Sequence, residues 1–296
     1  MKKKILIIGL GKMGQAHLFS FLNDNNYYDI DIYDKKKNLN FTSTLKKKIR
    51  FLKTMPKKNN YSFAILSTGP EVRYKLISNL LKNNKVKIIL LEKFLFKNKK
   101  EFEKFNKIKK KNSKIFVNLW AKIIIKRLGL KKLKNKKFDI EVKLKENNLL
   151  TNVVHFYYLV KLLNPGKKIK VDYKNAYLVK EKNFENYDEL NGKIEILSKN
   201  IKCSIVSQKK DVFKLGVKYS KMKINYSLQN GYLNYQLNNK RKKIQFPLAK
   251  YFTSKFFNDY FDKKLSYLPN YNEVAFISKK ILIDAENYFN KKLIIR

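Results

Sequence analysis

The chain contains 296 residues, of which 44% are hydrophobic and 31% are charged, and its formal net charge at pH 7 is +45. A chain of this length exceeds one small core and is typical of two domains of ordinary size. Hydrophobic residues occur along the whole sequence, which excludes an intrinsically disordered protein. The single cysteine, Cys203, excludes an intrachain disulfide and lies in a strand pattern typical of a small core residue.

The positive charge comes almost entirely from lysine, since only five of the 68 basic residues are arginine. Proteins that read nucleic-acid sequence depend on arginine for bidentate contacts. Here lysine is abundant in every segment, together with Asn, Ile, Tyr and Phe. We therefore favour a coding bias toward A and T, and we predict no specific nucleic-acid partner. A functional surface for a polyanion is the alternative.

The first 120 residues alternate between strand and helix patterns. Short apolar runs that indicate buried parallel strands occur at residues 4–8, 29–33, 62–67, 86–91 and 114–119. Stretches that indicate helices lie between them, at about residues 13–22, 70–82 and 97–111. Residues 38–60 are polar, and no element is predicted there. This alternation predicts an α/β Rossmann domain over residues 1–120, with a doubly wound parallel sheet.

The pattern changes after about residue 120. A strand is predicted at residues 137–144 and a long apolar helix at 149–163. Further strand patterns follow in near succession, at residues 169–173, 193–197, 201–206, 212–219, 223–228, 232–237 and 243–246. Asn230 and Gly231 form a strong hairpin signal, and two helices are predicted near 248–261 and 271–290. We expect residues 121–296 to form an α+β domain with a mainly antiparallel open sheet.

Membrane and metal sites are not predicted. Residues 1–8 superficially resemble a signal peptide, but the apolar run is short and Lys12 interrupts the segment. No stretch of about 18 apolar residues occurs, so we expect a cytoplasmic protein without a membrane span. The two histidines, His17 and His155, have no cysteine cluster beside them, which makes a zinc site unexpected.

Residues 9–14 (GLGKMG) match the G-x-G-x-x-G pattern of dinucleotide-binding loops. The pattern follows a buried strand and opens a helix, and Asp34 lies 20 residues beyond Gly14 at the end of the second strand. Gly9 would permit the tight turn, Gly11 would let a pyrophosphate approach the backbone, and Gly14 would let the helix pack on the sheet. The helix N-terminus would then bind the phosphates. The alternative is a glycine-rich turn that binds nothing.

Asp34 bears on the choice of cofactor. Its carboxylate would accept hydrogen bonds from the adenosine ribose and would repel a 2′-phosphate, which favours NAD over NADP. Lys35 and Lys36 follow at once and could soften that repulsion, so NADP remains the alternative.

Beyond this motif, the chain resembles the Gfo/Idh/MocA family of oxidoreductases, named for glucose–fructose oxidoreductase and inositol dehydrogenase. The likeness extends through most of the chain. Five segments carry it: residues 5–18 (ILIIGLGKMGQAHL), 65–70 (ILSTGP), 91–95 (LEKFL), 148–163 (NLLTNVVHFYYLVKLL) and 268–287 (LPNYNEVAFISKKILIDAEN). The resemblance implies a Rossmann domain followed by a domain that holds a small-molecule substrate, and it implies a homo-oligomer.

The resemblance also implies roles for single residues. Lys93 matches the family's lysine near the nicotinamide, and His155 matches the histidine facing the same site, so both are expected to be catalytic. A lysine at the carboxyl end of a parallel strand points into the ligand crevice and can transfer a proton there. Cofactor contacts are expected from Gly9, Gly11, Lys12, Met13, Gly14, Asp34, Ser67, Thr68, Glu92 and Lys93, and substrate contacts from Lys122, Thr151, Asn152 and Tyr158.

Several positions depart from the family pattern. Phe94 replaces the proline that follows the family's lysine, so the loop geometry is expected to differ. Thr151 and Tyr158 stand where aspartate is common, which removes carboxylates that would tune the base. Lys122 is the one charge in a segment where the family carries arginine.

These observations favour an NAD(P)-dependent oxidoreductase that acts on a secondary alcohol or ketone of a sugar or nucleotide sugar, with a role in surface polysaccharide synthesis. A second hypothesis is a dinucleotide-binding sensor or scaffold without turnover, which the departures near His155 motivate. A nucleic-acid-binding protein is the third, and charge is its one support.

Overall fold

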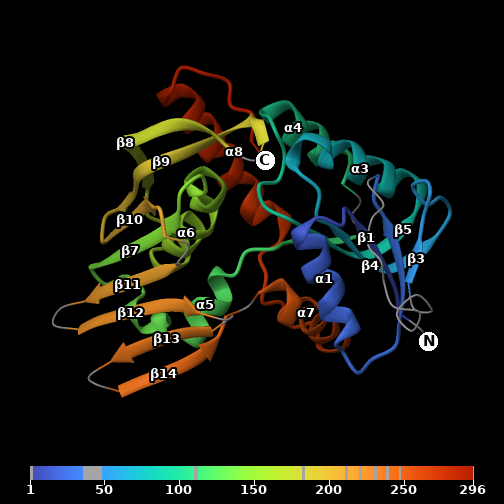
Figure 1. Cartoon of the computed structure of the whole chain (residues 1–296), viewed down its shortest axis with the longest axis horizontal. Coiled ribbons are helices and arrows are strands. Elements are labelled where there is room, and N and C mark those ends of the chain that lie inside the picture. Colours follow the sequence, from blue (N-terminus) through green and yellow to red (C-terminus); the bar gives the residue numbers. More distant parts are fainter. Residues whose placement is uncertain are drawn as a thin grey trace. The chain divides into compact units, whose positions relative to one another are not determined.

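The computed structural model describes residues 3–35, 49–109, 113–181, 184–210, 213–219, 222–229, 232–237, 240–246 and 248–295 (Figure 1). The chain forms two compact units, each built from separate parts of the sequence. The first unit contains Met1–Asn118 and Leu248–Ala275, and the second contains Leu119–Pro247 and Phe276–Arg296. The expected division into 1–120 and 121–296 therefore differs from the structure for residues 119–120 and 248–275.

A parallel sheet forms the centre of the first unit. Its strands are β1 (Lys3–Ile8), β2 (Tyr28–Tyr33), β3 (Ile49–Phe51), β4 (Asn60–Leu66), β5 (Lys85–Leu91) and β6 (Lys114–Val117). Their order is β3-β2-β1-β4-β5-β6, and every neighbouring pair is parallel. This confirms the predicted doubly wound sheet, whose strand order reverses between β1 and β4. Strand β3 lies within the polar region 38–60, and residues 36–48 are outside the described part.

Helices connect these strands, namely α1 (Lys12–Leu22), α3 (Pro70–Asn83) and α4 (Lys99–Ile108). The strands are apolar because both faces of the sheet are covered, and Ile5 to Ile8 are completely buried. Asn98 caps α4, since its side chain accepts a hydrogen bond from the backbone of Glu101 at 3.0 Å.

The late helix α7 (Ala249–Lys263) belongs to the core of the first unit. Phe257 of α7 stacks on Phe63 of β4, with ring centroids 4.8 Å apart and planes inclined by 7°. Phe21 of α1 packs edge-on against the ring of Phe257, with the two ring centroids 6.2 Å apart. The Rossmann core thus includes a helix encoded about 130 residues after its last strand.

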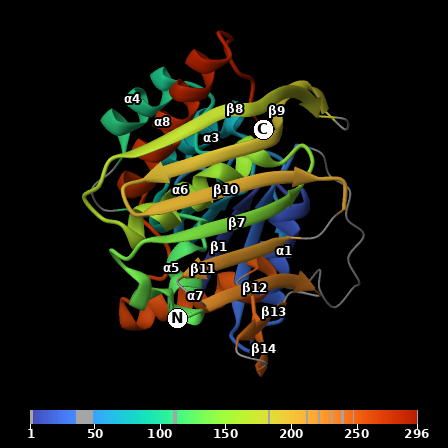
Figure 2. The ribbon, with the colours of Figure 1, turned by 90° about the vertical axis from the view of Figure 1, so that its left-hand side faces the viewer.

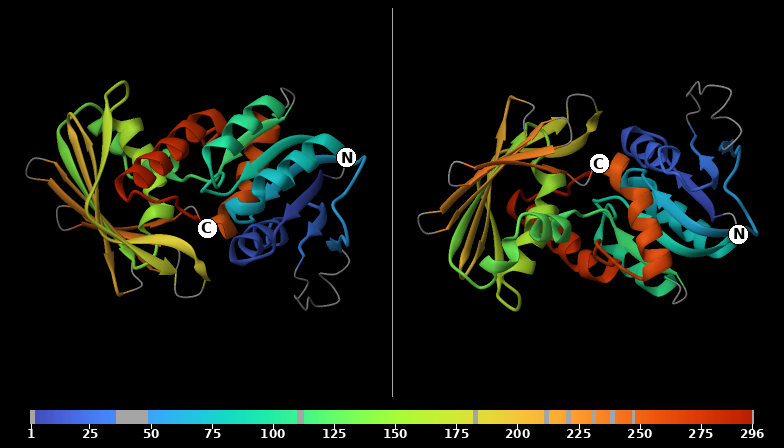
Figure 3. Two further views of the ribbon diagram at one scale, coloured as in Figure 1. Left: turned by 90° about the horizontal axis from the view of Figure 1, so that it is seen from above. Right: turned by 90° about the horizontal axis from the view of Figure 1, so that it is seen from below.

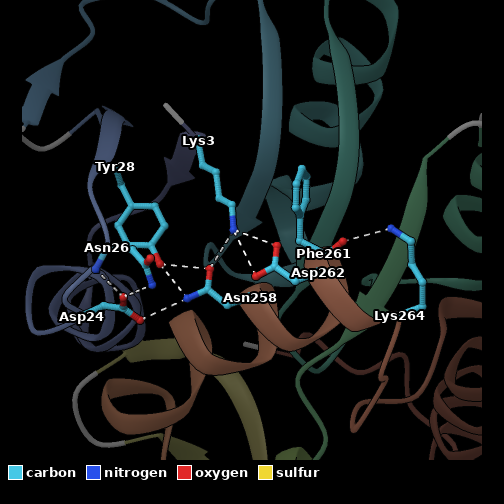
Figure 4. Close-up of polar contacts among 8 residues, drawn as sticks. All are labelled: Lys3, Asp24, Asn26, Tyr28, Asn258, Phe261, Asp262 and Lys264. Carbon is cyan, nitrogen blue, oxygen red and sulfur yellow. Dashed lines mark hydrogen bonds and ion pairs between the residues drawn. The ribbon is translucent and has the colours of Figure 1, made fainter. Parts of the chain in front are cut away.

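Polar contacts fix the same helix along β1 and β2 (Figure 4). The amide of Asn258 donates to the hydroxyl of Tyr28 at 2.8 Å and to the carboxylate of Asp24 at 3.2 Å. The ammonium of Lys3 lies 3.2 Å from Asp262 and 3.3 Å from the side-chain oxygen of Asn258. Burial raises the pKa of the Tyr28 hydroxyl to about 12, so this hydroxyl stays protonated.

A mixed sheet forms the second unit. Its strands are β7 (Phe138–Lys145), β8 (Ile169–Glu181), β9 (Phe184–Ser198), β10 (Ile201–Gln208), β11 (Lys214–Tyr219), β12 (Met222–Gln229), β13 (Tyr232–Leu237) and β14 (Lys240–Gln245). Their order is β14-β13-β12-β11-β7-β10-β9-β8. Only β7 and β10 pair in parallel among these described strands, which confirms the predicted mainly antiparallel sheet.

The sheet differs from the prediction in two places. Strands β8 and β9 form a long hairpin, whereas no strand was predicted for residues 174–192. The predicted turn at Asn230 and Gly231 lies outside the described residues, although Gln229 and Tyr232 pair on either side of it.

Helices pack on one face of this sheet. They include α6 (Leu149–Leu163), the unpredicted α5 (Ala121–Arg127) and the 3-10 helix η1 (Leu130–Leu133), while α8 (Tyr271–Tyr288) continues into this unit from the first. The residues of β7 alternate between buried and more exposed side chains, so only one face of the sheet is apolar enough to be covered by helices. Figure 2 looks onto the opposite face, where none of the described helices of this unit lies, and Figure 3 shows the same sheet edge-on. Cys203 of β10 is a buried core residue, as predicted. Among the described residues, no helix combines the length and the hydrophobicity of a membrane-spanning segment.

Candidate functional site

The glycine loop lies between β1 and α1, at the point where the strand order reverses. Gly9 has a φ of +91°, a conformation that favours glycine. A Cβ on Gly14 would lie 2.0 Å from the carbonyl oxygen of Gly9, so α1 can approach the loop this closely only with glycine there. A Cβ on Gly11 would have no atom within 4 Å. The loop is therefore closely packed where Gly14 meets Gly9, and it leaves open space at Gly11.

Ser67, directly after β4, holds this loop. Its backbone N–H donates to the carbonyl of Ile8 at 2.9 Å, and its hydroxyl donates to the carbonyl of Gly9 at 2.6 Å. Thr68 also touches the loop, since a Cβ on Gly9 would lie 2.8 Å from its methyl group. Ser67 and Thr68 were predicted to bind the cofactor, and the structure places both beside the glycine loop.

Asp34 reaches the loop from the end of β2. Its carboxylate accepts a hydrogen bond from the backbone N–H of Leu10. The loop is also bonded to β2 directly, because the N–H of Gly9 donates to the carbonyl of Tyr33 at 2.9 Å. Lys12 and Met13, at the start of α1, are exposed beside it. The spacing in the sequence thus identified groups that meet in space.

Glu92 is buried in a network that sequence analysis did not predict. Its carboxylate lies 2.8 Å from Nε2 of His17 and 2.6 Å from the amide of Asn118. Nδ1 of His17 in turn lies 2.7 Å from the hydroxyl of Thr253 on α7. Burial alone would raise the pKa of Glu92, but the hydrogen bonds from His17 and Asn118 outweigh it and hold the pKa below the usual range. Glu92 therefore links α1, β5 and β6 as an ionised acceptor.

Lys93 is the second residue after β5 and is half-buried. The peptide bond from Lys93 to Phe94 is cis, and the Phe94 side chain is completely buried. Like Ser67 and Asp34, Lys93 stands at the carboxyl end of a strand in the parallel sheet. Ligands of such sheets bind along this edge.

Arg73 fixes the loops that carry Thr68 and Lys93. Its guanidinium is fully buried and donates to the carbonyl oxygens of Glu92 at 2.8 Å and of Leu95 at 3.1 Å. It also donates to the carbonyls of Phe94 and Thr68. Burial lowers the pKa of Arg73 to about 10, which the charge of Glu92 partly offsets. One signal in the sequence was missed, because Arg73 shares a face of α3 with the buried residues Ile77 and Leu80.

His155 lies in the second unit, on the buried helix α6. The side chain is 4% exposed, and Trp120 stacks on the imidazole with centroids 4.6 Å apart and planes inclined by 11°. The ammonium of Lys122 lies 6.0 Å from the ring centroid of Tyr158, which itself is 1% exposed. The structure thus gathers Trp120, Lys122, His155 and Tyr158 around α5 and α6.

Thr151 and Asn152 are engaged at the start of α6. The hydroxyl of Thr151 donates to the carboxylate of Glu189 at 2.9 Å, and its backbone N–H donates to the same carboxylate at 3.3 Å. Asn152 donates to the carbonyl of Asn148 at 2.8 Å. Burial raises the pKa of Glu189, and hydrogen bonds from Leu190 and Thr151 offset this only in part. A carboxylate thus reaches position 151 from β9, although the sequence there lacks the family's aspartate.

No group of three or more metal-binding side chains occurs in the part of the chain that the structure describes.

Comparison with known proteins identifies the fold. No family model matches the sequence, and no curated protein matches it. A super-repressor mutant of Gal80p from Saccharomyces cerevisiae has a TM-score of 0.68 at 11% identity, over 99% of this chain and 98% of that chain. Biliverdin reductase from Synechocystis sp. PCC 6803, in complex with biliverdin and NADP+, has a TM-score of 0.62 at 11% identity, over 96% and 98%. An oxidoreductase from Bacillus cereus has a TM-score of 0.64 at 12% identity, over 97% and 96%. The chain is thus similar over nearly its whole length to proteins with the Gfo/Idh/MocA-like fold, as the sequence resemblance implied.

Proposed function

We propose that the protein is an NAD(P)-dependent oxidoreductase. The observation that carries the proposal is the glycine loop at the strand-order reversal, with Asp34 bonded to it from β2. Dinucleotides bind across this point in doubly wound sheets. The oxidoreductases among the structural neighbours support the same class of activity.

The residues present fit a nicotinamide dinucleotide. The open space at Gly11 leaves room for a pyrophosphate, and the first N–H groups of α1 would donate to it. Lys12 and Met13 flank that position, while Asp34 would accept hydrogen bonds from the adenosine ribose. We propose NAD as the cofactor because of the Asp34 charge. The neighbour that binds NADP+ keeps NADP as the alternative.

A bound nicotinamide supplies hydride transfer, and the protein must supply the proton transfer. We propose that Nζ of Lys93 takes the proton of the substrate hydroxyl as the hydride leaves the carbon, or returns it in reduction. Glu92 was predicted as a cofactor contact. In this proposal its role is to position Lys93, because its hydrogen bonds to His17 and Asn118 orient the end of β5.

We propose a secondary alcohol or ketone of a sugar or nucleotide sugar as the substrate, with a place in surface polysaccharide synthesis. His155 and Lys122 would orient its hydroxyl groups, with Thr151, Asn152 and Tyr158 as further contacts. The stacking of Trp120 on His155 supports an orienting role, because it fixes the imidazole plane.

Two glycine substitutions test the cofactor site. The backbone of Gly11 has a φ of −64°, and a Cβ there meets no atom, so Gly11→Val should fold normally and abolish NAD(H) binding. Gly14→Val should instead destabilise the protein itself, because its Cβ would collide with the Gly9 carbonyl. The measurement is the melting temperature with and without saturating NAD(H) or NADP(H), since ligand binding stabilises the folded state by mass action. A wild-type melting temperature that neither cofactor changes would reject the proposal.

The second candidate function is a dinucleotide-binding regulator without turnover. Gal80p of Kluyveromyces lactis is a transcriptional regulator and has the same fold, with a TM-score of 0.66 at 10% identity over 99% of this chain and 94% of that chain. Cofactor binding without hydride transfer to any member of a broad sugar series would select this function.

A further inference from the structure

Eight lysines gather at one end of the second unit, on three loops that are far apart in the sequence. The loops are residues 129–137, which include the 3-10 helix η1, and residues 164–168 and 199–200. They carry Lys131, Lys132, Lys134, Lys136, Lys137, Lys167, Lys168 and Lys199, which we call the lysine cluster. The loops adjoin the starts of β7, β8 and β10, because Ile201 pairs with both Phe138 and Ser198, and Ser198 pairs with Ile169. This end is opposite the arrowheads of β7 and β10 in Figure 2.

Hydrogen bonds hold the three loops together. The N–H of Asn135 donates to the carbonyl of Leu163 at 2.9 Å, and the amide of Asn200 donates to the carbonyl of Asn135 at 3.0 Å. The amide of Asn164 donates to the hydroxyl of Ser198 at 2.8 Å. The lysines therefore project from one fixed backbone framework.

The charge of the cluster is not compensated by nearby carboxylates. All eight lysines are exposed, half of the residues in the loops are lysine, and none is acidic. Among the described residues, none of the eight ammonium groups forms an ion pair. Elsewhere in this unit Glu141, Asp188 and Glu195 each contact two lysines within 4.0 Å. These three acidic residues thus pair with other lysines, and the three loops carry eight positive charges and no carboxylate of their own.

We propose that the lysine cluster binds the phosphate backbone of nucleic acid without reading its sequence. Lysine acts as a point charge toward phosphate, whereas base readout and planar recognition depend on arginine. None of the exposed large hydrophobic side chains of the described residues lies in these loops. Side chains of that kind insert into membranes and anchor protein partners, so their absence from the described loops favours the phosphate backbone.

Binding through a cluster differs from binding through total charge. If the +45 net charge alone attracts DNA, any lysines removed in equal number weaken binding equally. If the cluster makes the contacts, removing its lysines weakens DNA binding far more than removing the same number of lysines elsewhere. The proposal is independent of the dinucleotide site, which lies in the first unit.

The test compares two variants of the full chain with equal charge. One carries Lys→Gln changes at Lys131, Lys132, Lys134, Lys136 and Lys137, and the control carries them at the exposed lysines Lys53, Lys57, Lys75, Lys82 and Lys85 of the first unit. Fluorescence anisotropy measures binding to a labelled DNA duplex of two unrelated sequences from about 50 to about 200 mM salt. Thermal melting of both variants serves as the control that they are folded.

We expect the cluster variant to bind roughly tenfold or more weakly at about 100 mM salt, with a salt slope smaller by up to about 0.9 per lost phosphate contact. The control should stay within about threefold of wild type, and the two DNA sequences should bind alike. Equal weakening of both variants would overturn the proposal, and so would a loss confined to anionic lipid vesicles assayed in parallel. Sequence-selective binding would overturn it as well.

Discussion

Asp34 combines a charge with a structural hydrogen bond, because its carboxylate accepts from the Leu10 N–H of the glycine loop. The charge is what should separate NAD from NADP, whereas the acceptor atom holds the loop. The two roles can be separated by substitution, since asparagine keeps an acceptor and removes the charge.

Asp34→Ala should weaken NAD binding and narrow the gap to NADP, because the ribose acceptor and the repulsive charge disappear together. Asp34→Asn should narrow the gap with a smaller loss of NAD affinity. Calorimetric titration with both cofactors measures the effect. Asp29→Ala, which removes an exposed charge from the same strand, is the control. A wild-type preference for NADP of roughly tenfold would contradict the role of Asp34 and favour Lys35.

Lys93→Met should leave NAD(H) affinity within a few fold of wild type, because methionine keeps most of the stem. It should lower kcat on the substrate by roughly 10²-fold or more, the usual scale for a lost proton-transfer group. His155→Ala should cost less and act partly through KM, since an orienting role is assigned to it. Steady-state kinetics of the three proteins decides. Normal turnover by Lys93→Met beside an inactive His155→Ala would place the base on α6 instead.

Single residues also show where sequence analysis reached its limit. Gly9, Gly14 and Asp34 were found because their spacing along the chain reflects one local turn and two adjacent strands. Arg73 and Glu189 were not found, because their partners are distant in sequence: Arg73 donates to the carbonyl of Glu92, and Glu189 accepts from the N–H of Thr151. Nothing beside them in the sequence marks those partners.

At the scale of elements, the hairpin of β8 and β9 was only partly predicted. Its middle contains the buried polar residues Asp188, Glu189 and Asn191, which interrupt the apolar alternation of a strand. Each is buried because it has a tertiary partner. Asn191, for example, accepts from the N–H of Asn147 at 2.7 Å.

Asp188 attaches the C-terminal segment to β9. Its carboxylate accepts from Lys291 at 2.8 Å and from the N–H of Ile294 at 2.9 Å, and its own N–H donates to the Ile294 carbonyl at 2.7 Å. Burial would raise the pKa of Asp188, but hydrogen bonds from Ile294, Lys291 and Lys180 lower it below its usual value. The stabilisation is therefore complete above the unfolded pKa near 3.9 and is lost as pH falls through the lower folded pKa.

Asp188→Asn should loosen residues 291–295, because the charge-assisted bonds are lost while the backbone pair remains. We expect a loss of about 1–3 kcal/mol of unfolding free energy at neutral pH and a smaller further loss on acidification than in wild type. Hydrogen exchange of the last residues and urea unfolding at several pH values measure both effects. Asp172→Asn, on the neighbouring β8, is the control. Unchanged exchange at residues 291–295 would refute the attachment.

At the scale of the whole molecule, the two fold classes were predicted correctly, while the path of the chain between the units was not. Periodicity reports which face of an element is buried, not which partner buries it. Helix α7 was predicted as an amphipathic helix, but nothing in its sequence shows that Phe257 packs on Phe63 of β4.

A fragment of residues 1–120 should therefore fail to fold cooperatively. It lacks α7, so it would expose Phe63 and Phe21 and leave His17 without Thr253. The same fragment joined by a linker to residues 248–275 should regain a sharp thermal transition. Circular dichroism on heating tests both. A cooperative transition in the shorter fragment, at the temperature of the full chain, would show that α7 is dispensable.

The late arrival of α7 also constrains how the protein is made. The chain emerges from the ribosome with its N-terminus first, so β1 to β6 are synthesised long before α7, the helix that completes their core. The nascent parallel sheet therefore lacks α7, and Phe63 lacks its partner Phe257, while residues 119–247 are synthesised and begin to fold. Translation speed and chaperone protection over that interval should therefore govern the yield of native protein more than the stability of the finished fold.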